Sequence, residues 1–380
     1  MTPREAIYLD HAATTPTDPR VVETMLPYFT EKSGNPSSIH SFGQQAHLGL
    51  NAARETAAKA LGCGLEDVVF TSGATEANNL VIRGMAHALK EKGRHIITLA
   101  IEHPCVLESC RLLEKEGFEV TYLPVDQEGR VSLEDLKEAL RDDTILISIM
   151  AANNEVGTIQ PIMEIGRTAQ ERGVFFHTDA VQYYGSFPCK VMELGVSSLV
   201  LSAHKFGGPK GIGLAYLKKG TVIKPLIVGG GQEFGERSGT QNVPGAVGMG
   251  RAIEITESER EERKESLIDL RRAFMEALDG IDHSLNTPLE SSVPHILNME
   301  FPGVDAAKLV VRLDLEGVAV STGSACSNID SDLSHVLMAM GRSEKQAKSS
   351  VRFSFGTGTT EEETLQAASI VQRVVAELKK

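Results

Sequence analysis

Residues 67–100 read DVVFTSGATEANNLVIRGMAHALKEKGRHIITLA and establish the pattern that organises most of the chain. The apolar run 67–73 predicts a strand, the amphipathic stretch 74–93 predicts a helix ending at Gly93, and 95–100 predicts a second strand. Strands this apolar are usually buried on both faces of a sheet. A helix between two such strands is typical of a mostly parallel sheet covered by helices.

The same alternation continues to residue 205. Further helices are predicted at 104–117, 132–143 and 162–173, and further strands at 118–125, 144–151, 174–180 and 197–205. Beyond the glycine-rich stretch 228–250 the pattern changes to a long charged helix at about 255–280, strands at 295–301, 317–322 and 349–356, and a last helix at 361–380. We therefore predict an α/β protein with a large, mostly parallel-sheet domain at 15–255. A small α+β domain is predicted from 1–14 and 256–380.

Composition excludes several classes of protein. The 380 residues include 38 Lys and Arg against 51 Asp and Glu, a net charge of −13, which argues against a general nucleic-acid or anionic-membrane surface. No stretch approaches the roughly eighteen apolar residues of a membrane helix. The first sixteen residues lack the apolar core of a secretory signal. The five cysteines form no C-x-x-C pair, so we expect neither a disulfide framework nor a metal site, and a cytoplasmic location.

Three polar elements follow predicted strands, where open parallel sheets bind ligands. The first is Ser72-Gly73-Ala74-Thr75, between a strand and a helix. Backbone N–H groups at a helix start can bind an anion, and the Thr75 hydroxyl could add to them. A plain helix cap is the alternative interpretation of this element.

The second and third elements are a carboxylate and a lysine. Asp179 ends an apolar strand, where burial is costly without a partner such as a protonated ring nitrogen, although a local turn would also explain it. Lys205 follows the strand 197–205 with Ser202 and His204 before it. A lysine partly removed from water has a lowered pKa and can form a Schiff base with an aldehyde, although most lysines lie at the surface.

Together, the anion site, the carboxylate and the lysine match the phosphate, pyridine nitrogen and aldehyde of pyridoxal 5′-phosphate. His103, just after the strand 95–100, could stack on the pyridine ring, or it could simply begin the next helix. The coincidence of these features on successive strand ends favours the cofactor.

The motifs resemble those of a known family. In order, the chain contains YLDHAATTP (8–16), GNPSSIHSFG (34–43), FTSGATEANNL (70–80), ANNEVGTIQPI (152–162), HTDAVQ (177–182), SAHKFGGPKGIG (202–213), RSGTQNVP (237–244) and STGSAC (321–326). This order is similar to that of the NifS/IscS-like cysteine desulfurases, a class V group within the fold-type I pyridoxal-phosphate enzymes. The resemblance runs from about residue 7 to the last helix.

The resemblance implies a role for each matching residue. Lys205 would hold the cofactor covalently and move protons on the substrate, Asp179 would pair with the pyridine nitrogen, and His103 would stack on the ring. The remaining cofactor contacts implied are Gly73, Ala74, Thr75, Asn154, Gln182, Ser202, His204 and, from the neighbouring subunit of a homodimer, Thr240. Asn154 and Arg352 would orient the substrate L-cysteine, with Arg352 binding its carboxylate.

Cys326 is the residue that would carry the sulfur. Its small polar neighbours in STGSACSNIDSD (321–332) predict an exposed loop, and its thiolate would attack the sulfur of L-cysteine to leave alanine and a persulfide. His103 is a candidate for assisting that thiolate, and the other four cysteines are expected to be packing residues. The acceptor would be an iron–sulfur scaffold or a tRNA-thiolating enzyme, and the unusual residues 328–333 would affect the choice.

Three rival functions remain open from the sequence. A class V aminotransferase would share Lys205 and Asp179 without needing Cys326, and a selenocysteine lyase could tolerate losing that thiol. A nucleotide-binding or scaffold protein would use the glycine-rich segments 207–211 and 228–232, but neither fits the G-x-x-x-x-G-K-[ST] motif.

Overall fold

The computed structural model describes residues 6–323 and 333–379. Its strands are β1 (Ile7–Tyr8), β2 (Val68–Thr71), β3 (His95–Leu99), β4 (Glu119–Leu123), β5 (Thr144–Ser148), β6 (Phe175–Asp179), β7 (Ser198–Ser202), β8 (Gly213–Leu217), β9 (Ser284–Leu285), β10 (Ile296–Glu300), β11 (Val318–Ala319) and β12 (Ser350–Ser354). Its α-helices are α1 (Pro19–Met25), α2 (Ser41–Leu61), α3 (Ala74–Leu89), α4 (Pro104–Lys115), α5 (Leu133–Ala139), α6 (Ile162–Arg172), α7 (Val191–Leu194), α8 (Val243–Ala277), α9 (Ala306–Leu315), α10 (His335–Ala339), α11 (Glu344–Ala347) and α12 (Glu361–Leu378).

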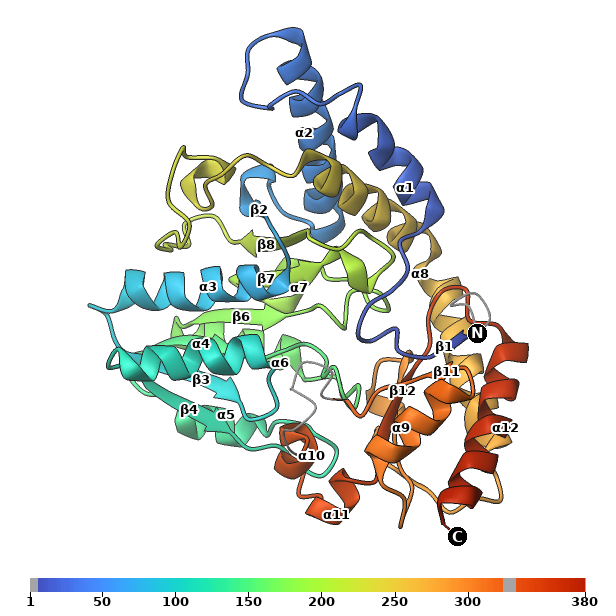
Figure 1. Ribbon diagram of the computed structural model, residues 1–380. Coiled ribbons are helices and arrows are strands. Elements are labelled where there is room, and N and C mark those ends of the chain that lie inside the picture. Colours follow the sequence, from blue (N-terminus) through green and yellow to red (C-terminus); the bar gives the residue numbers. More distant parts are fainter. Residues whose placement is uncertain (1–5, 324–332, 380) are drawn as a thin grey trace.

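A seven-stranded sheet in the order β2-β8-β7-β6-β5-β3-β4 forms the centre of the larger part of the molecule (Figure 1). From β7 through β6, β5 and β3 to β4, each strand runs parallel to its neighbour in the sheet, which confirms the predicted mostly parallel sheet. β8 runs antiparallel to both of its neighbours, β2 and β7. The sequence had not indicated this strand, because its residues GLAYL continue a glycine-rich motif and no helix separates them from β7.

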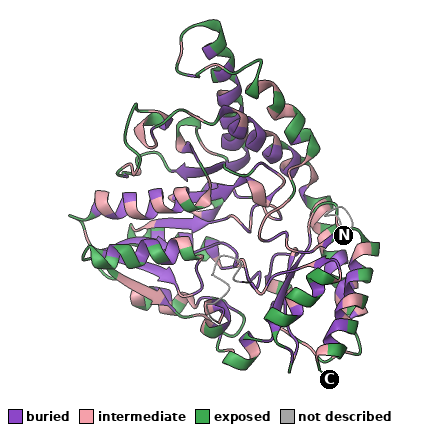
Figure 2. Cartoon of the chain, viewed as in Figure 1, coloured by how far each residue is buried: buried purple, intermediate pink, exposed green. Residues whose placement is uncertain are grey.

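Successive residues of the central strands point to opposite faces of the sheet and enter two different cores. Val69, Ile96 and Val200 belong to a core with helices α3 and α4. Their neighbours Phe70, Ile97 and Leu201 belong to a core with α2, α6, α7 and part of α8. Because both faces are covered by helices, buried residues follow the strands and the inner sides of the helices (Figure 2).

A smaller antiparallel sheet, β12-β10-β9, lies beside α9, α12 and the C-terminal half of α8 (Figure 1). Its core contains Phe274, Phe301, Phe353 and Phe355, with ring centroids 4.8 Å apart for Phe274 and Phe353. Ile7 and Leu9, from the start of the chain, pack in the same core, and β1 pairs with β11. The domain boundaries at 14/15 and 255/256 stay a prediction.

Helix α8 begins earlier than predicted, at Val243 instead of about residue 255. Asn242 caps it by accepting a hydrogen bond from the Gly245 N–H at 3.0 Å. The glycines at this end of α8, which suggested a loop, lie inside the helix, where they allow close packing. A Cβ on Gly250 would lie 2.9 Å from the Ala53 Cα in α2. The small residues therefore let two helices approach closely. Helix propensity alone would have missed this, since glycine disfavours helices in isolation.

Within residues 6–323 and 333–379, no helix is both long and apolar enough to cross a bilayer. In the same part of the chain, no three His, Cys, Asp or Glu side chains are arranged to hold a metal ion.

Candidate active site

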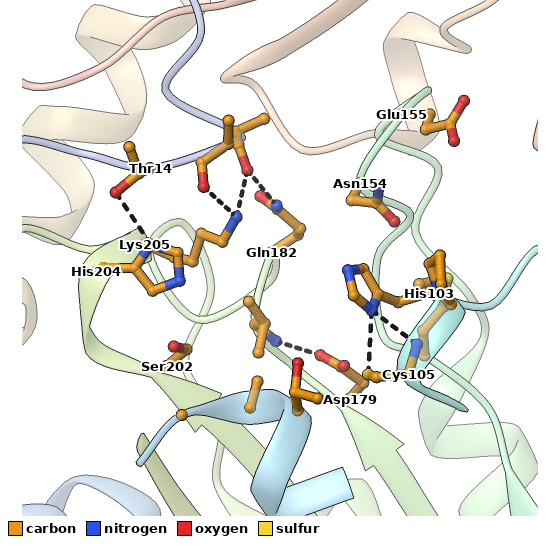
Figure 3. Close-up of a pocket in the computed structure, with 18 of the residues that line it drawn as sticks. Thr14, His103, Cys105, Asn154, Glu155, Asp179, Gln182, Ser202, His204 and Lys205 are labelled. Atoms are coloured by element: carbon orange, nitrogen blue, oxygen red, sulfur yellow. Dashed lines mark hydrogen bonds between the residues drawn. The ribbon is translucent and has the colours of Figure 1, made fainter. Parts of the chain in front are cut away.

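A cavity of about 1000 Å³ opens at the carboxyl ends of the parallel strands, and Figure 3 shows many of its lining side chains. This is the edge at which open parallel sheets bind ligands. Eleven of the residues predicted for the site line the cavity: Gly73, Ala74, Thr75, His103, Asn154, Asp179, Gln182, Ser202, His204, Lys205 and Arg352. The topology thus brings together residues that are up to 279 positions apart in the sequence.

Lys205 lies in a short 3-10 helix, Ala203–Lys205, that directly follows β7. Its Nζ donates hydrogen bonds to the carbonyl oxygens of Ala12 at 2.5 Å and Ala13 at 2.8 Å (Figure 3). The Gln182 side-chain amide donates to the same Ala12 oxygen at 2.9 Å. The N-terminal segment therefore supplies backbone acceptors that hold the amine at the cavity wall.

Asp179 is the last residue of β6, and only 7% of its surface is exposed. Its Oδ1 accepts a hydrogen bond from the Val181 N–H at 3.0 Å, and its Oδ2 accepts one from the Asn78 Nδ2 at 2.7 Å. Two N–H donors stabilise the ionised form of a carboxyl group. The side chain nevertheless lines the cavity, where a further donor can reach it.

His103 caps helix α4, and its Nδ1 accepts a hydrogen bond from the Cys105 N–H at 3.2 Å. Burial lowers the pKa of His103 most, the positive charge of Lys205 lowers it further, and the charge of Asp179 opposes both effects. The imidazole is therefore uncharged at neutral pH. A flat neutral ring at this wall can stack on an aromatic ligand.

The opposite wall suits an anion. Helix α3 begins at Ala74 without a side-chain cap, so its first N–H groups are available at the cavity. A Cβ on Gly213 would lie 2.8 Å from the Gly73 Cα, so glycine is needed there for β8 to approach this helix start. His204 shares a hydrogen bond of 3.1 Å with the Thr14 hydroxyl, and burial lowers its pKa to about 4. It therefore contributes as a neutral hydrogen-bonding group.

Arg352 comes from β12 of the smaller sheet and is 2% exposed. Its guanidinium donates to Asp10 Oδ1 at 2.7 Å and to the backbone oxygen of Asn154 at 2.8 Å. Its Nε has no hydrogen-bond partner among the described residues. The side chain nevertheless lines the cavity, so its guanidinium borders the space where a ligand would bind.

Two of the predicted site residues do not appear in the cavity lining. Thr240 is exposed on the loop before α8, which fits the prediction that it acts on a neighbouring subunit without testing it. Cys326 lies outside the described residues, but Gly323 and Leu333, which flank that segment, both line the cavity.

Other cavity residues were not predicted from the sequence. His335 and Glu155 line the wall, and Asn78 supports Asp179 from within α3. The signal for Asn78 was a polar residue on the apolar face of a predicted helix. Cys105, expected only to pack, packs against the α3–α4 core and also lines the cavity.

This arrangement of an amine, a buried carboxylate, a stacking ring and an anion site defines a class of enzyme site, and comparison with known proteins identifies its family. The family model for class-V aminotransferases matches residues 7–366, and the chain belongs to this family. The family depends on pyridoxal 5′-phosphate.

More specific similarity comes from individual relatives. The chain is 50% identical to the protein named cysteine desulfurase IscS of Dictyoglomus turgidum, over 99% of this chain and 96% of that one. Among solved structures, one titled NifS-like protein covers 98% of this chain and 100% of its own, with a TM-score of 0.93 and 42% identity. Another, titled SspA in complex with cysteine, covers 92% of this chain and 98% of its own, with a TM-score of 0.84 and 37% identity.

The residues present fit the family's cofactor. The amine of Lys205, the buried carboxyl group of Asp179 and the uncapped start of α3 supply one group for each of its aldehyde, ring nitrogen and phosphate. All three lie on the wall of a single cavity.

Proposed function

We propose that this protein is a cysteine desulfurase, which takes sulfur from L-cysteine, leaves L-alanine and keeps the sulfur as a persulfide on Cys326. The observation that carries the proposal is that the Lys205 cavity is bordered by both ends of the segment containing Cys326. The high identity to proteins named cysteine desulfurase supports it.

Each cavity wall would perform one task. Lys205 would hold the cofactor through Nζ and later move a proton at the substrate carbon, while Asp179 would accept a hydrogen bond from the ring nitrogen. When bound, pyridoxal 5′-phosphate withdraws electrons from the bonds of the attached amino acid. His103 would stack on the ring. The remaining cofactor contacts would be Gly73, Ala74, Thr75, Asn154, Gln182, Ser202 and His204, with Thr240 of a second copy of the chain.

The substrate would be oriented from the smaller sheet. Asn154 and Arg352 would bind the amino acid, with Arg352 directed at its carboxylate. The position of Arg352 in the cavity lining supports this role, because its fork of N–H donors matches a carboxylate. A charged clamp of this kind selects an amino acid over an uncharged thiol.

Sulfur transfer would occur at Cys326. Its thiolate would attack the substrate sulfur, the carbon–sulfur bond would break, and the bonding electrons would stay on the carbon until a proton arrives. Cys326 is three positions after Gly323 in the sequence, a chain length of at most about 11 Å. Because Gly323 lines the cavity, this reach supports access to the bound substrate.

The persulfide would then pass to an acceptor, either an iron–sulfur scaffold protein or a tRNA-thiolating enzyme. We propose that the protein works as a cytoplasmic homodimer. The exposed position of Thr240 supports the dimer, because that residue could reach the cavity of a partner.

The test is release of alanine and sulfide from L-cysteine in the presence of a thiol reductant. The wild type should form both products in equal amounts, and Cys326→Ala should form neither. The matched control is Cys63→Ala, at a half-buried thiol that does not line the cavity. If Cys326→Ala retains activity, Cys326 is not the sulfur acceptor, and a lyase or aminotransferase becomes the better assignment.

A further inference from the structure

A row of hydrogen-bonded side chains runs from the central sheet, behind the cavity wall, to helix α4, and its members Asp179, Cys105 and His103 line the cavity. On its sheet side, Ser198 Oγ lies 2.9 Å from His177 Nδ1, and His177 Nε2 lies 2.9 Å from Asn78 Oδ1. On its helix side, Asn78 Nδ2 donates both to Asp179 Oδ2 at 2.7 Å and to Cys105 Sγ at 3.3 Å. Cys105 Sγ lies 3.0 Å from His103 Nδ1 (Figure 3).

The direction of the first hydrogen bonds follows from Asp179. Its carboxylate accepts from the Val181 N–H, and the Asn78 side chain must turn its NH₂ group toward the other oxygen. Asn78 Oδ1 then faces His177 and needs a donor. Burial lowers the pKa of His177 to about 3, so the ring is neutral and its one N–H must be on Nε2. The Ser198 hydroxyl accordingly donates to His177 Nδ1.

The direction of the last hydrogen bonds follows from the backbone. The Cys105 N–H can only donate, so His103 Nδ1 carries a lone pair and the ring proton is on Nε2. Burial, followed by the negative charge of Asp179, raises the pKa of the Cys105 thiol to about 12. The thiol therefore keeps its proton and can donate it to the same His103 Nδ1. Its sulfur at the same time accepts from Asn78.

We propose that Asn78 and Cys105 are positioning residues whose side chains join Asp179 and His103 into one hydrogen-bonded unit. The proposal rests on the proposed function, because it takes Asp179 and His103 as the groups that contact the cofactor. Asn78 supplies one N–H to each arm of the unit. The sulfur of Cys105 accepts the second of these N–H groups, and its S–H group donates to His103.

Packing alone predicts a different behaviour. Cys105 also contacts the α3–α4 core, so a purely structural role would depend on its volume and not on its S–H group. Serine keeps the donor, whereas valine keeps an apolar side chain and loses the donor. The two substitutions therefore separate the two roles.

The first experiment follows the imidazole ¹⁵N signals of His103 against pH in the full-length, cofactor-loaded protein, with His103→Gln used to assign the signal. Loss of the thiol donor in Cys105→Val should raise the pKa of His103 by about half a unit, whereas Cys105→Ser should stay within about 0.2 units. Asp179, Lys205 and His335, the charged or titratable groups that act on His103, are unchanged in both variants. Equal shifts in the two variants, or no shift in either, would overturn the role of the thiol.

The second experiment measures the affinity of the cofactor-free protein for pyridoxal 5′-phosphate by absorbance titration. Asn78→Ala should weaken binding about tenfold, because Asp179 loses the hydrogen bond that holds its Oδ2. Asn79→Ala is the matched control on the same helix, since the side chain of Asn79 donates to the Thr75 carbonyl of its own helix at 2.9 Å. If both variants bind equally well, Asn78 does not position Asp179. Neither experiment requires turnover of L-cysteine, so failure of the desulfurase assignment would be detected separately.

Discussion

Two parts of the molecule bury charge in different ways. Arg54 of α2 and Glu233 form a closed pair, with Nη1–Oε2 and Nη2–Oε1 distances of 2.8 Å and side-chain exposures of 6% and 1%. Glu233 also accepts from the Phe70 N–H at 2.8 Å, and the guanidinium lies 4.9 Å from the Phe70 ring centroid and 5.0 Å from that of Phe234. The cavity charges, by contrast, border about 1000 Å³ of open space.

The difference shows that burial of charge does not by itself mark a functional site. The hydrogen bonds of the Arg54–Glu233 pair are made to protein groups. The pair also stabilises Glu233 and Phe234 at left-handed φ values of 47° and 59°. The cavity residues, by contrast, border open space that a ligand can enter. Access for a ligand therefore separates a site that can react from an ion pair that only stabilises the fold.

The largest expected effect is on catalysis at Lys205. Lys205→Ala should lower kcat for alanine formation by about 10³-fold or more, because the proposed mechanism uses this amine both to hold the cofactor and to move a proton at the reacting carbon. The control is Lys219→Ala, in an exposed turn after β8, which should change kcat less than about twofold. A slow but clearly measurable turnover in Lys205→Ala, at a tenth of wild type or above, would contradict the assignment.

Substitution of Arg54 should lower the stability of the fold, whereas substitution of Lys205 lowers catalysis. Arg54→Met leaves the Glu233 carboxylate buried without its partner and should lower the free energy of unfolding by about 3–5 kcal/mol. Arg251→Met is the control, since its ion pair with Glu254 is exposed and should contribute less than about 1 kcal/mol. Urea denaturation measures both values. Equal denaturation midpoints in the two variants would show that the Arg54 pair is not structurally important.

A smaller effect is expected at Arg352. Arg352→Lys keeps the positive charge but loses the fork of N–H donors, so kcat/KM for L-cysteine should fall about 10- to 100-fold. Most of the change should appear in KM. A variant with a normal KM and a reduced kcat would mean that Arg352 does not bind the substrate carboxylate.

The smallest effect concerns Glu102, which lies next to His103 and is 1% exposed. Burial raises the pKa of Glu102 well above its ordinary value, the charge of Asp179 adds to this, and a hydrogen bond from the Met150 N–H opposes it. The folded state therefore holds this proton more tightly than the unfolded state does. Its contribution to stability is present below the ordinary pKa of glutamate and is lost as pH rises toward the raised value.

Replacing Glu102 by Gln should remove the part of the pH dependence of the free energy of unfolding that this carboxyl group causes. The free energy of unfolding of Glu102→Gln minus that of wild type should grow with pH, by at most about 1.4 kcal/mol per pH unit. Glu108→Gln, at a side chain of α4 that is 65% exposed, is the matched control for replacing a glutamate by glutamine. Parallel curves for wild type and Glu102→Gln between pH 5 and pH 8 would contradict the argument.

Much of this arrangement could be predicted from the sequence, because alternating apolar strands and amphipathic helices determine a parallel sheet, and the polar residues at its strand ends must then meet. Asp179 and Lys205 were recognisable for that reason. The strand β8 and the first turns of α8 were not, since their glycines are explained only by a close neighbour such as Ala53. The position of Asn78 depends on contacts with Asp179 and His177 that local sequence does not contain.

Cys326 would receive the sulfur, and locating the persulfide in the enzyme tests this proposal. The full-length enzyme is mixed with L-cysteine without reductant, alkylated, digested and examined by mass spectrometry. The peptide containing Cys326 should become heavier by one sulfur atom, and the same peptide from Lys205→Ala should not. If the added sulfur is found on Cys105, whose side chain lines the cavity, or on no cysteine, this protein is not a Cys326-dependent desulfurase.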